Sequence, residues 1–189
     1  LRLWDTSKQS DPPASIPLAD QDVRSVEFSP DGHWLVASGD AMGPHKYYIA
    51  KLWDLTKGTP TLSNAFALDK NSDVITSLAF SPDSSILATG DLRGTILLWD
   101  MQHLDKSPDR ISVNNPDPSD YSADGVESLA LSPDKLLAVS TFGGLIWLWD
   151  LKQPGAGPTK FDAFSNFSQA EKESMMGYLL EVRSVAFSP

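Results

Sequence analysis

The chain has 189 residues, of which 25 are acidic and 15 basic, so its formal net charge at pH 7 is −10. A surface this acidic repels a phosphate backbone and an anionic membrane, which argues against nucleic acid or lipid as the partner. The absence of cysteine excludes disulfide bonds, thiolate metal sites and a cysteine nucleophile. No apolar run approaches the roughly 20 residues that span a bilayer, and no basic-then-apolar signal opens the sequence. We therefore expect a soluble protein, with the cytoplasm as its compartment.

Two short motifs recur in phase along the sequence. The first is a Leu-Trp-Asp triplet that ends an apolar run, and its tryptophans are 49, 46 and 50 residues apart: Trp4, Trp53, Trp99 and Trp149. The second is a Phe/Leu-Ser-Pro turn at residues 28–30, 80–82, 131–133 and 187–189. A repeat of this length that closes on Trp-Asp is typical of a propeller blade. We expect the four tryptophans to be structural core residues, and Trp147 to face away from Trp149.

The strand pattern divides the chain into blades. A partial blade at residues 1–21 supplies a third and a fourth strand, and a partial blade at 181–189 supplies one first strand. Three complete blades, at about 22–69, 73–113 and 125–165, each have three apolar strands and a more polar fourth. The pattern thus predicts fifteen strands. Because propellers of this type close with about 4 to 8 blades, we expect the chain to be part of a longer propeller.

Helix is expected at one place only. Residues 166–181 contain helix-forming residues with an apolar flank and resemble a short amphipathic segment. A tolerated surface insertion is an equally good interpretation, since loops accept extra length at little cost.

These motifs resemble the WD-repeat family of β-propellers, and the segments 23–30 and 182–189 resemble the long WD arrays of bacteria. The resemblance implies an all-β propeller of four-stranded antiparallel blades. It also implies that each Trp bonds a Ser or Thr of the second strand, here Ser38, Thr89 or Ser140. The family's Asp in the turn before the third strand is expected to be missing, because other residues stand six positions before the tryptophans: Tyr47, Arg93 and Gly143.

The resemblance implies a non-enzymatic scaffold for protein–protein interaction. In bacterial arrays such a propeller acts as the sensor of a signalling ATPase, kinase or caspase-like peptidase. The loops before the first strand and between the second and third strands gather on one rim, the family's usual partner face. Our candidate partner-binding residues lie there, in the inner strands and in two loop insertions: Arg24, Thr76, Glu127, Arg183, His45, Tyr47, Met175 and Tyr178. For any single one of them, ordinary solvated surface is the alternative.

No residue pattern predicts catalysis, a metal site or a cofactor. The three histidines, His33, His45 and His103, stand at different places in their repeats, so they give no metal or nucleophile–base spacing. Two alternatives to the scaffold stay open. One is a propeller-based hydrolase with a metal in the central channel, and the other is a structural repeat that self-assembles.

Overall fold

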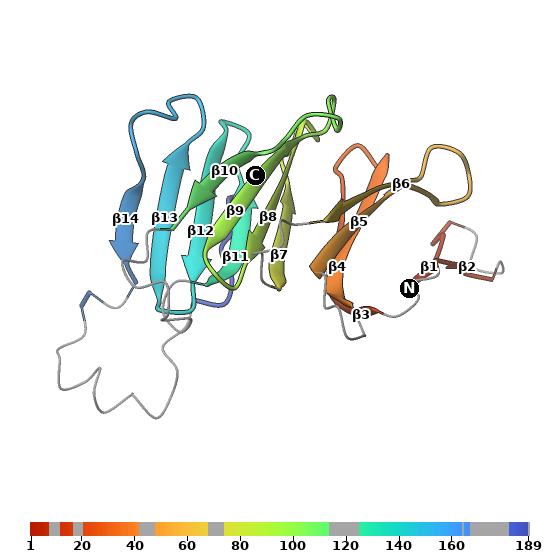
Figure 1. Ribbon diagram of the computed structural model, residues 1–189, viewed down its shortest axis with the longest axis horizontal. Helices are drawn as coiled ribbons and strands as arrows, with labels where there is room; N and C mark the ends of the chain where they lie inside the picture. The colour runs from red at the N-terminus through yellow and green to blue at the C-terminus, as the bar shows by residue number, and fades with distance from the viewer. Residues whose placement is uncertain are drawn as a thin grey trace.

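The computed structural model describes residues 1–7, 12–16, 21–41, 48–67, 74–113, 125–163, 165–166 and 182–188. Within these residues the chain forms 14 strands and no helix (Figure 1). The strands make three four-stranded antiparallel sheets and one two-stranded sheet. The predicted all-β fold with four-stranded antiparallel blades is confirmed. The helix expected within 166–181 falls, apart from Asn166, outside the described residues.

Each blade is built from strands that pair in chain order. The partial blade consists of β1 (Arg2–Leu3) and β2 (Ala14–Ser15). The first blade consists of β3 (Gln21–Phe28), β4 (Trp34–Ala41), β5 (Tyr48–Asp54) and β6 (Thr61–Ala67). The second consists of β7 (Ile75–Phe80), β8 (Ile86–Asp91), β9 (Thr95–Asp100) and β10 (Asp109–Ser112). The third consists of β11 (Val126–Leu131), β12 (Leu136–Thr141), β13 (Leu145–Asp150) and β14 (Thr159–Asp162).

The Ser-Pro-Asp motif makes the tight turn between the first two strands of a blade. In the second blade the Ser81 hydroxyl donates to Asp83 Oδ1 at 2.6 Å and accepts the N–H of Ile86 at 2.9 Å. The residue after the Asp lies in the left-handed region, with φ of 73° at Gly32, 57° at Ser84 and 63° at Lys135. The motif is therefore turn chemistry, in which side-chain oxygens satisfy the backbone.

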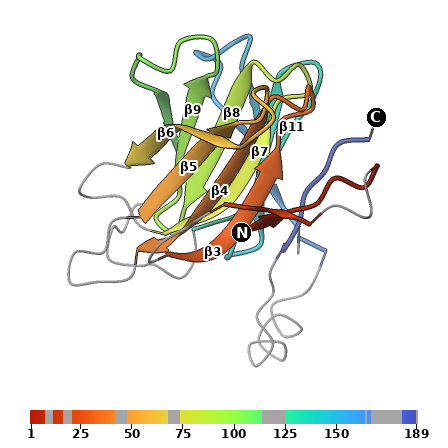
Figure 2. The ribbon, with the colours of Figure 1, turned by 90° about the vertical axis from the view of Figure 1, so that its right-hand side faces the viewer.

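Apolar residues from neighbouring blades form the core. Between the first and second blades, Leu52 packs with Phe80 and Trp99. Between the second and third, Ile96 packs with Leu131 and Trp149. The first strands β3, β7 and β11 lie side by side at the inner edge (Figure 2). Each blade thus buries its faces against its neighbours, as repeat architectures do.

The core tryptophans differ at the partial blade. Trp53, Trp99 and Trp149 are 3%, 9% and 8% exposed. Trp4 was expected to be equally buried, but it is 60% exposed. β1 pairs only with β2, and no described strand covers the outer side of the Trp4 indole. For Trp4 the expectation of a core position is wrong.

Two further expectations need correction. Residues 182–188 are described but do not form the fifteenth strand, because they make no backbone ladder with any described strand. Trp147 does not face away from Trp149: their rings stack with centroids 5.8 Å apart. Side chains two positions apart on a strand lie on the same face. The expectation that Trp147 and Trp149 face opposite ways is therefore wrong.

The blades have two ends, which we name by their loops. The turn rim carries the connections β3–β4, β7–β8 and β11–β12 together with β5–β6, β9–β10 and β13–β14. The approach rim carries the connections that precede β3, β7 and β11, and those between the second and third strands. Among the described residues no helix is long and apolar enough to cross a membrane.

Candidate functional site

Each blade has a β-bulge near the approach rim, and the three bulges contain three of the predicted partner-binding residues. In each blade the register between the first and second strands skips one residue: Arg24, Thr76 and Glu127. A bulge leaves its extra residue unpaired in the ladder and redirects the side chain. The same backbone irregularity thus recurs in all three blades with a different side chain in each.

The bulge residues differ in exposure and in their hydrogen bonds. Arg24 is exposed, as is Arg183 at the matching position of the last segment, whereas Thr76 and Glu127 are half-buried. The Thr76 hydroxyl lies 2.5 Å from the carbonyl of Val126 and 3.2 Å from that of Gly90. Thr76 therefore joins the second blade to the third, and its position alone accounts for its residue type.

The serine after each bulge was not singled out from the sequence. The Ser77 hydroxyl accepts the N–H of Leu129 at 3.0 Å, and the Ser128 hydroxyl accepts the N–H of Val185 at 3.3 Å. The first bond joins the inner strands β7 and β11, and the second joins β11 to the segment 182–188. The signal was available, because Ser recurs directly before the middle apolar residue of each first strand and of the segment 182–188: Ser25, Ser77, Ser128 and Ser184.

Blades two and three approach so closely that one position on β8 must be glycine. A Cβ built on Gly90 would lie 2.5 Å from Cγ1 of Val126, whose side chain is fully buried. Together with the Thr76 and Ser77 bonds, this contact fixes the spacing between neighbouring bulges. The bulge residues are therefore held on a rigid support.

The expected hydrogen bond from the tryptophan to the second strand is present in the second blade. Trp99 Nε1 donates to Thr89 Oγ1 at 3.3 Å, but Ser38 Oγ and Ser140 Oγ are buried and have no hydrogen-bond partner among the described residues. As expected, the position six residues before Trp99 holds Arg93 and not the family's Asp. A different residue, Asp91, eight positions before Trp99, bonds this turn: its Oδ1 accepts the N–H groups of Arg93 at 2.9 Å and Thr95 at 2.8 Å.

The remaining predicted site residues lie outside the described part of the chain. These are His45 and Tyr47 in one insertion, and Met175 and Tyr178 in the other. Their role in partner binding stays a prediction.

The charged groups near the turns are engaged locally. His33 lies 3.2 Å from Asp31, and His103 lies 2.8 Å from Asp100, each within its own turn. Hydrogen bonds from Ser81 and Ser85 lower the pKa of Asp83 to about 2. Within the described ranges no three His, Asp or Glu side chains come together as metal ligands would. The described geometry thus offers backbone-supported surface side chains, which suit recognition of another molecule.

Four-stranded antiparallel blades with neighbouring inner strands define the class of β-propellers. Comparison with known proteins agrees. The family model "WD domain, G-beta repeat" matches residues 14–42 and 64–100. A chain in the crystal structure of the mitotic checkpoint complex matches with a TM-score of 0.64 at 16% identity, covering 84% of this chain and 44% of that one. The crystal structure of RRP9 WD40 repeats gives a TM-score of 0.60 at 14% identity, covering 79% and 41%.

Three relatives of this chain are animal proteins. Protein groucho of Drosophila melanogaster is 26% identical over 158 residues, which is 81% of this chain and 19% of that protein. Transcription factor unc-37 of Caenorhabditis elegans is 29% identical over 166 residues, covering 81% and 24%. Transducin-like enhancer protein 2 of Mus musculus is 27% identical over 110 residues, covering 54% and 13%. The chain spans less than a quarter of each of these relatives. The family model thus matches two segments of this chain, and the solved structures are similar to it in fold.

Proposed function

We propose that this chain is a non-enzymatic scaffold that presents its approach rim to a protein or peptide partner. The observation that carries the proposal is the repeated bulge: one backbone geometry places an exposed Arg24 in the first blade and a half-buried Glu127 in the third, while Thr76 in the second blade joins its neighbours. Side chains that vary on a constant support are how a repeat protein builds a specific surface. None of the three relatives is named for an enzymatic activity, which also supports the proposal.

We further propose that the chain is the partner-recognition part of a larger signalling protein. The relatives it resembles are several times longer than the matched region, which fits a module within a larger protein. Kinship with bacterial sensor arrays rests on the sequence resemblance alone, because the relatives reported above are animal proteins. The cytoplasm remains our predicted compartment. Imaging of the tagged protein tests it, and a nuclear signal would overturn it.

Partner capture in cells tests the scaffold role. We expect Arg24→Glu combined with Arg183→Glu to reduce capture by the tagged protein strongly, with little change in Tm, because exposed substitutions usually stay within about 0.5 kcal/mol. The matched control is Lys57→Glu with Lys152→Glu, two exposed lysines on the turn rim. Loss of capture in the control together with normal capture by the Arg24/Arg183 variant would show that the binding face is assigned wrongly.

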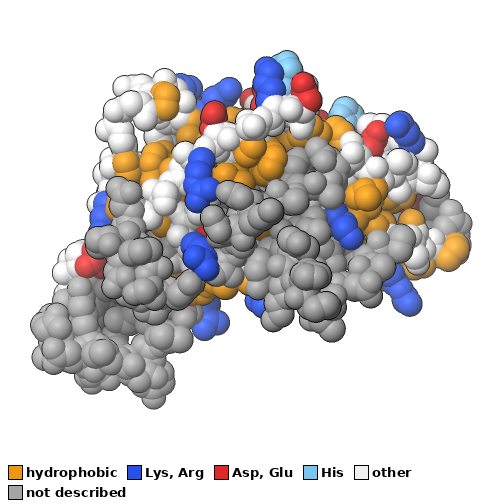
Figure 3. Space-filling model, in the orientation of Figure 1, with side chains coloured by type: hydrophobic (Ala, Val, Ile, Leu, Met, Phe, Trp, Pro, Cys, Tyr) orange, Lys and Arg blue, Asp and Glu red, His pale blue; other side chains and the backbone are white. Residues whose placement is uncertain are grey.

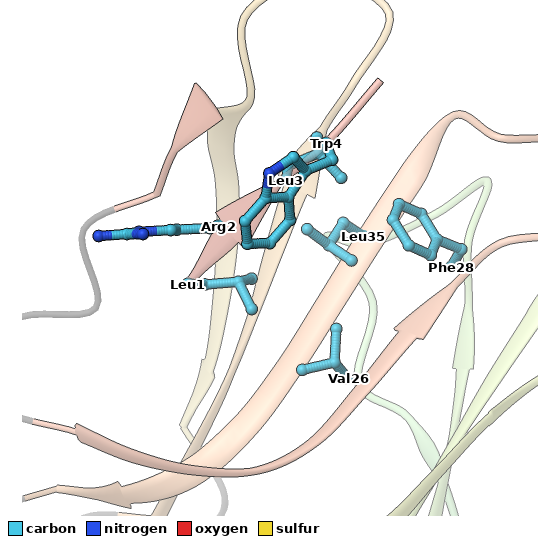
Figure 4. A pocket seen from close by; sticks show the side chains of 7 residues that line it. All are labelled: Leu1, Arg2, Leu3, Trp4, Val26, Phe28 and Leu35. Carbon is cyan, nitrogen blue, oxygen red and sulfur yellow. The ribbon is translucent and has the colours of Figure 1, made fainter. Parts of the chain in front are cut away.

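Self-association is the second candidate function, and one feature favours it. An open hollow of about 220 Å³ lies between the partial and first blades, and Leu1, Trp4, Val26 and Phe28 surround Leu35 there (Figure 4). Val26 is 38% and Phe28 49% exposed. Exposed apolar surface of this kind is typical of interaction sites. Analytical ultracentrifugation tests the idea: a mass that rises with concentration and falls with Phe28→Ser supports it, and a constant mass refutes it.

A propeller-based hydrolase with a channel metal gains no support from the described residues, among which no three His, Asp or Glu side chains lie together as metal ligands would. Elemental analysis of the purified protein tests the metal part of that alternative. Stoichiometric bound metal would reopen it.

A further inference from the structure

One copy of the Ser-Pro-Asp motif stands out of phase with the repeat. The tripeptide occurs four times in the sequence, at residues 29–31, 81–83, 107–109 and 132–134. Three copies make the turn between the first two strands of a blade. The copy at 107–109 instead ends the β9–β10 loop and begins β10, at the turn rim of the second blade. The repeat pattern does not account for this copy, because the second blade already has its turn at 81–83.

The three turn serines are buried and bonded. Ser29, Ser81 and Ser132 are 3%, 3% and 5% exposed. Each hydroxyl accepts a backbone N–H across its own turn, at 2.8, 2.9 and 2.9 Å respectively. A charged group attached to any of them would be buried and would displace that bond, which is strongly unfavourable. These three serines are therefore structural.

Ser107 has the opposite environment. It is exposed, and its hydroxyl makes no hydrogen bond within the described part of the chain. Pro108 biases the backbone of the residue before it toward an extended conformation, and neither residue belongs to a turn. β10, which begins at Asp109, pairs only with β9. Ser107 thus presents a free hydroxyl on an extended backbone.

The loop that carries Ser107 projects from the second blade. In Figure 1 the β9–β10 connection extends at the upper edge of the molecule, and Figure 3 shows charged side chains and a histidine gathered at that edge. Ser107 also lines an open groove of about 1120 Å³ between the second and third blades. An enzyme can therefore reach the hydroxyl, and the groove leaves room for a phosphoryl group beside it.

The residues after Ser107 match the sequence that one class of protein kinase recognises. Cyclin-dependent kinases phosphorylate a serine or threonine that is followed directly by proline, and they prefer a basic residue three positions after the acceptor. Proline has no backbone N–H, so an enzyme surface without a hydrogen-bond acceptor at this point favours it. Ser107 has Pro108 and Arg110 at these two positions. Arg110 is exposed, and its Nη2 donates to Thr95 Oγ1 at 3.1 Å.

Two other hydroxyls provide matched comparisons within the chain. Ser132 has the same sequence features, with proline next and Lys135 at the third position, but it is buried. Thr59 is exposed and followed by proline, but Leu62 stands at the third position. Of these three hydroxyls, Ser107 alone combines the full sequence match with exposure.

We propose that Ser107 is a phosphorylation site for a protein kinase of the cyclin-dependent class. Ser107 Oγ forms a bond to the γ-phosphorus of MgATP as the bond from that phosphorus to ADP breaks, and the hydroxyl proton passes to the catalytic aspartate of the kinase. The product carries an added charge of about −1.5 to −2 at pH 7. This modification goes beyond the proposed scaffold function, because it gives the turn rim a charge that an enzyme can add.

Phosphopeptide mapping tests the proposal, after the purified protein is treated with MgATP and a purified cyclin-dependent kinase. We expect phosphate at Ser107 and none at Ser132 in the folded protein. Pro108→Ala should slow phosphorylation of Ser107 about tenfold or more, and Arg110→Ala should slow it less. Synthetic peptides of residues 103–112 and 128–137 are the controls, and both should be phosphorylated, because only the fold protects Ser132.

The outcomes decide the proposal in either direction. A phosphorylated 103–112 peptide with no phosphate at Ser107 in the folded protein would overturn it, as would phosphate at Thr59 without phosphate at Ser107. An unchanged rate for Pro108→Ala would show that the kinase does not recognise the motif. Equal phosphorylation of Ser107 and Ser132 in the folded protein would contradict selection by burial. Circular dichroism shows that each variant is folded, and partner capture in cells decides the scaffold function separately.

Discussion

Phe80 and Phe28 occupy the same position in the repeat, but their side chains differ in burial. Phe80 is 7% exposed, between the second blade and the first, whereas Phe28 is 49% exposed on the open face of the first blade. Trp99 and Trp4 differ in the same way, at 9% and 60%. The comparison teaches that the repeat sequence sets which face is apolar, and that the neighbouring blade decides whether the face is a core or a surface.

The largest effect should separate the two tryptophans. Trp99→Ala removes a buried indole and its bond to Thr89, so we expect a loss of roughly 3 to 5 kcal/mol in the free energy of unfolding. Trp4→Ala should change it by less than about 0.5 kcal/mol. Denaturant unfolding of both variants measures the difference. Equal losses would mean that Trp4 is covered in solution and the contrast between blades is wrong.

The interface between the second and third blades should also tolerate no added side-chain volume where Gly90 contacts Val126. Gly90→Ala places a Cβ 2.5 Å from Val126, and overpacking of this kind costs about 1 to 3 kcal/mol. Gly155→Ala is the control, because no atom lies within 4 Å of its added Cβ. Thermal unfolding distinguishes them. A neutral Gly90→Ala would show that the second and third blades are less tightly packed than described.

The serine bond between inner strands provides a smaller test. Ser77→Ala leaves the buried N–H of Leu129 without its partner, which costs about 1 kcal/mol or somewhat more. Ser25→Ala, at the matching position of the open first blade, should be close to neutral. Chemical denaturation of the two variants compares them directly. A larger effect at Ser25 would reverse the proposed difference between the blades.

Motif spacing predicted the blades because the tryptophans and the Ser-Pro turns are local signals with fixed positions in a strand. Burial of Trp4 could not be predicted, since it depends on strands far away in sequence. The bulges at Arg24, Thr76 and Glu127 were invisible for a related reason: register is a property of two strands together. The turn bonds of Asp91 were missed because only the position six residues before Trp99 was considered.

The smallest expected effect is on the stability of the fold at low pH. The pKa of Asp83 is lowered from 3.8 to about 2, chiefly by the Ser81 hydroxyl, so the ionised form stabilises the fold above pH 3.8. That contribution is lost as pH falls from about 4 to 2. Because the side chain is exposed, we expect less than about 1 kcal/mol. Tm of wild type and Asp83→Asn should differ at pH 6 and converge near pH 2. A constant difference would refute the assignment.

Site-specific photo-crosslinking tests the scaffold function most directly. A photoreactive amino acid at Arg24 reports contact at the approach rim, and one at Lys57 reports contact at the turn rim of the same blade. The account predicts that the partner captured in cells cross-links from position 24 and not from position 57. Cross-links from position 57 alone would contradict the proposed binding face.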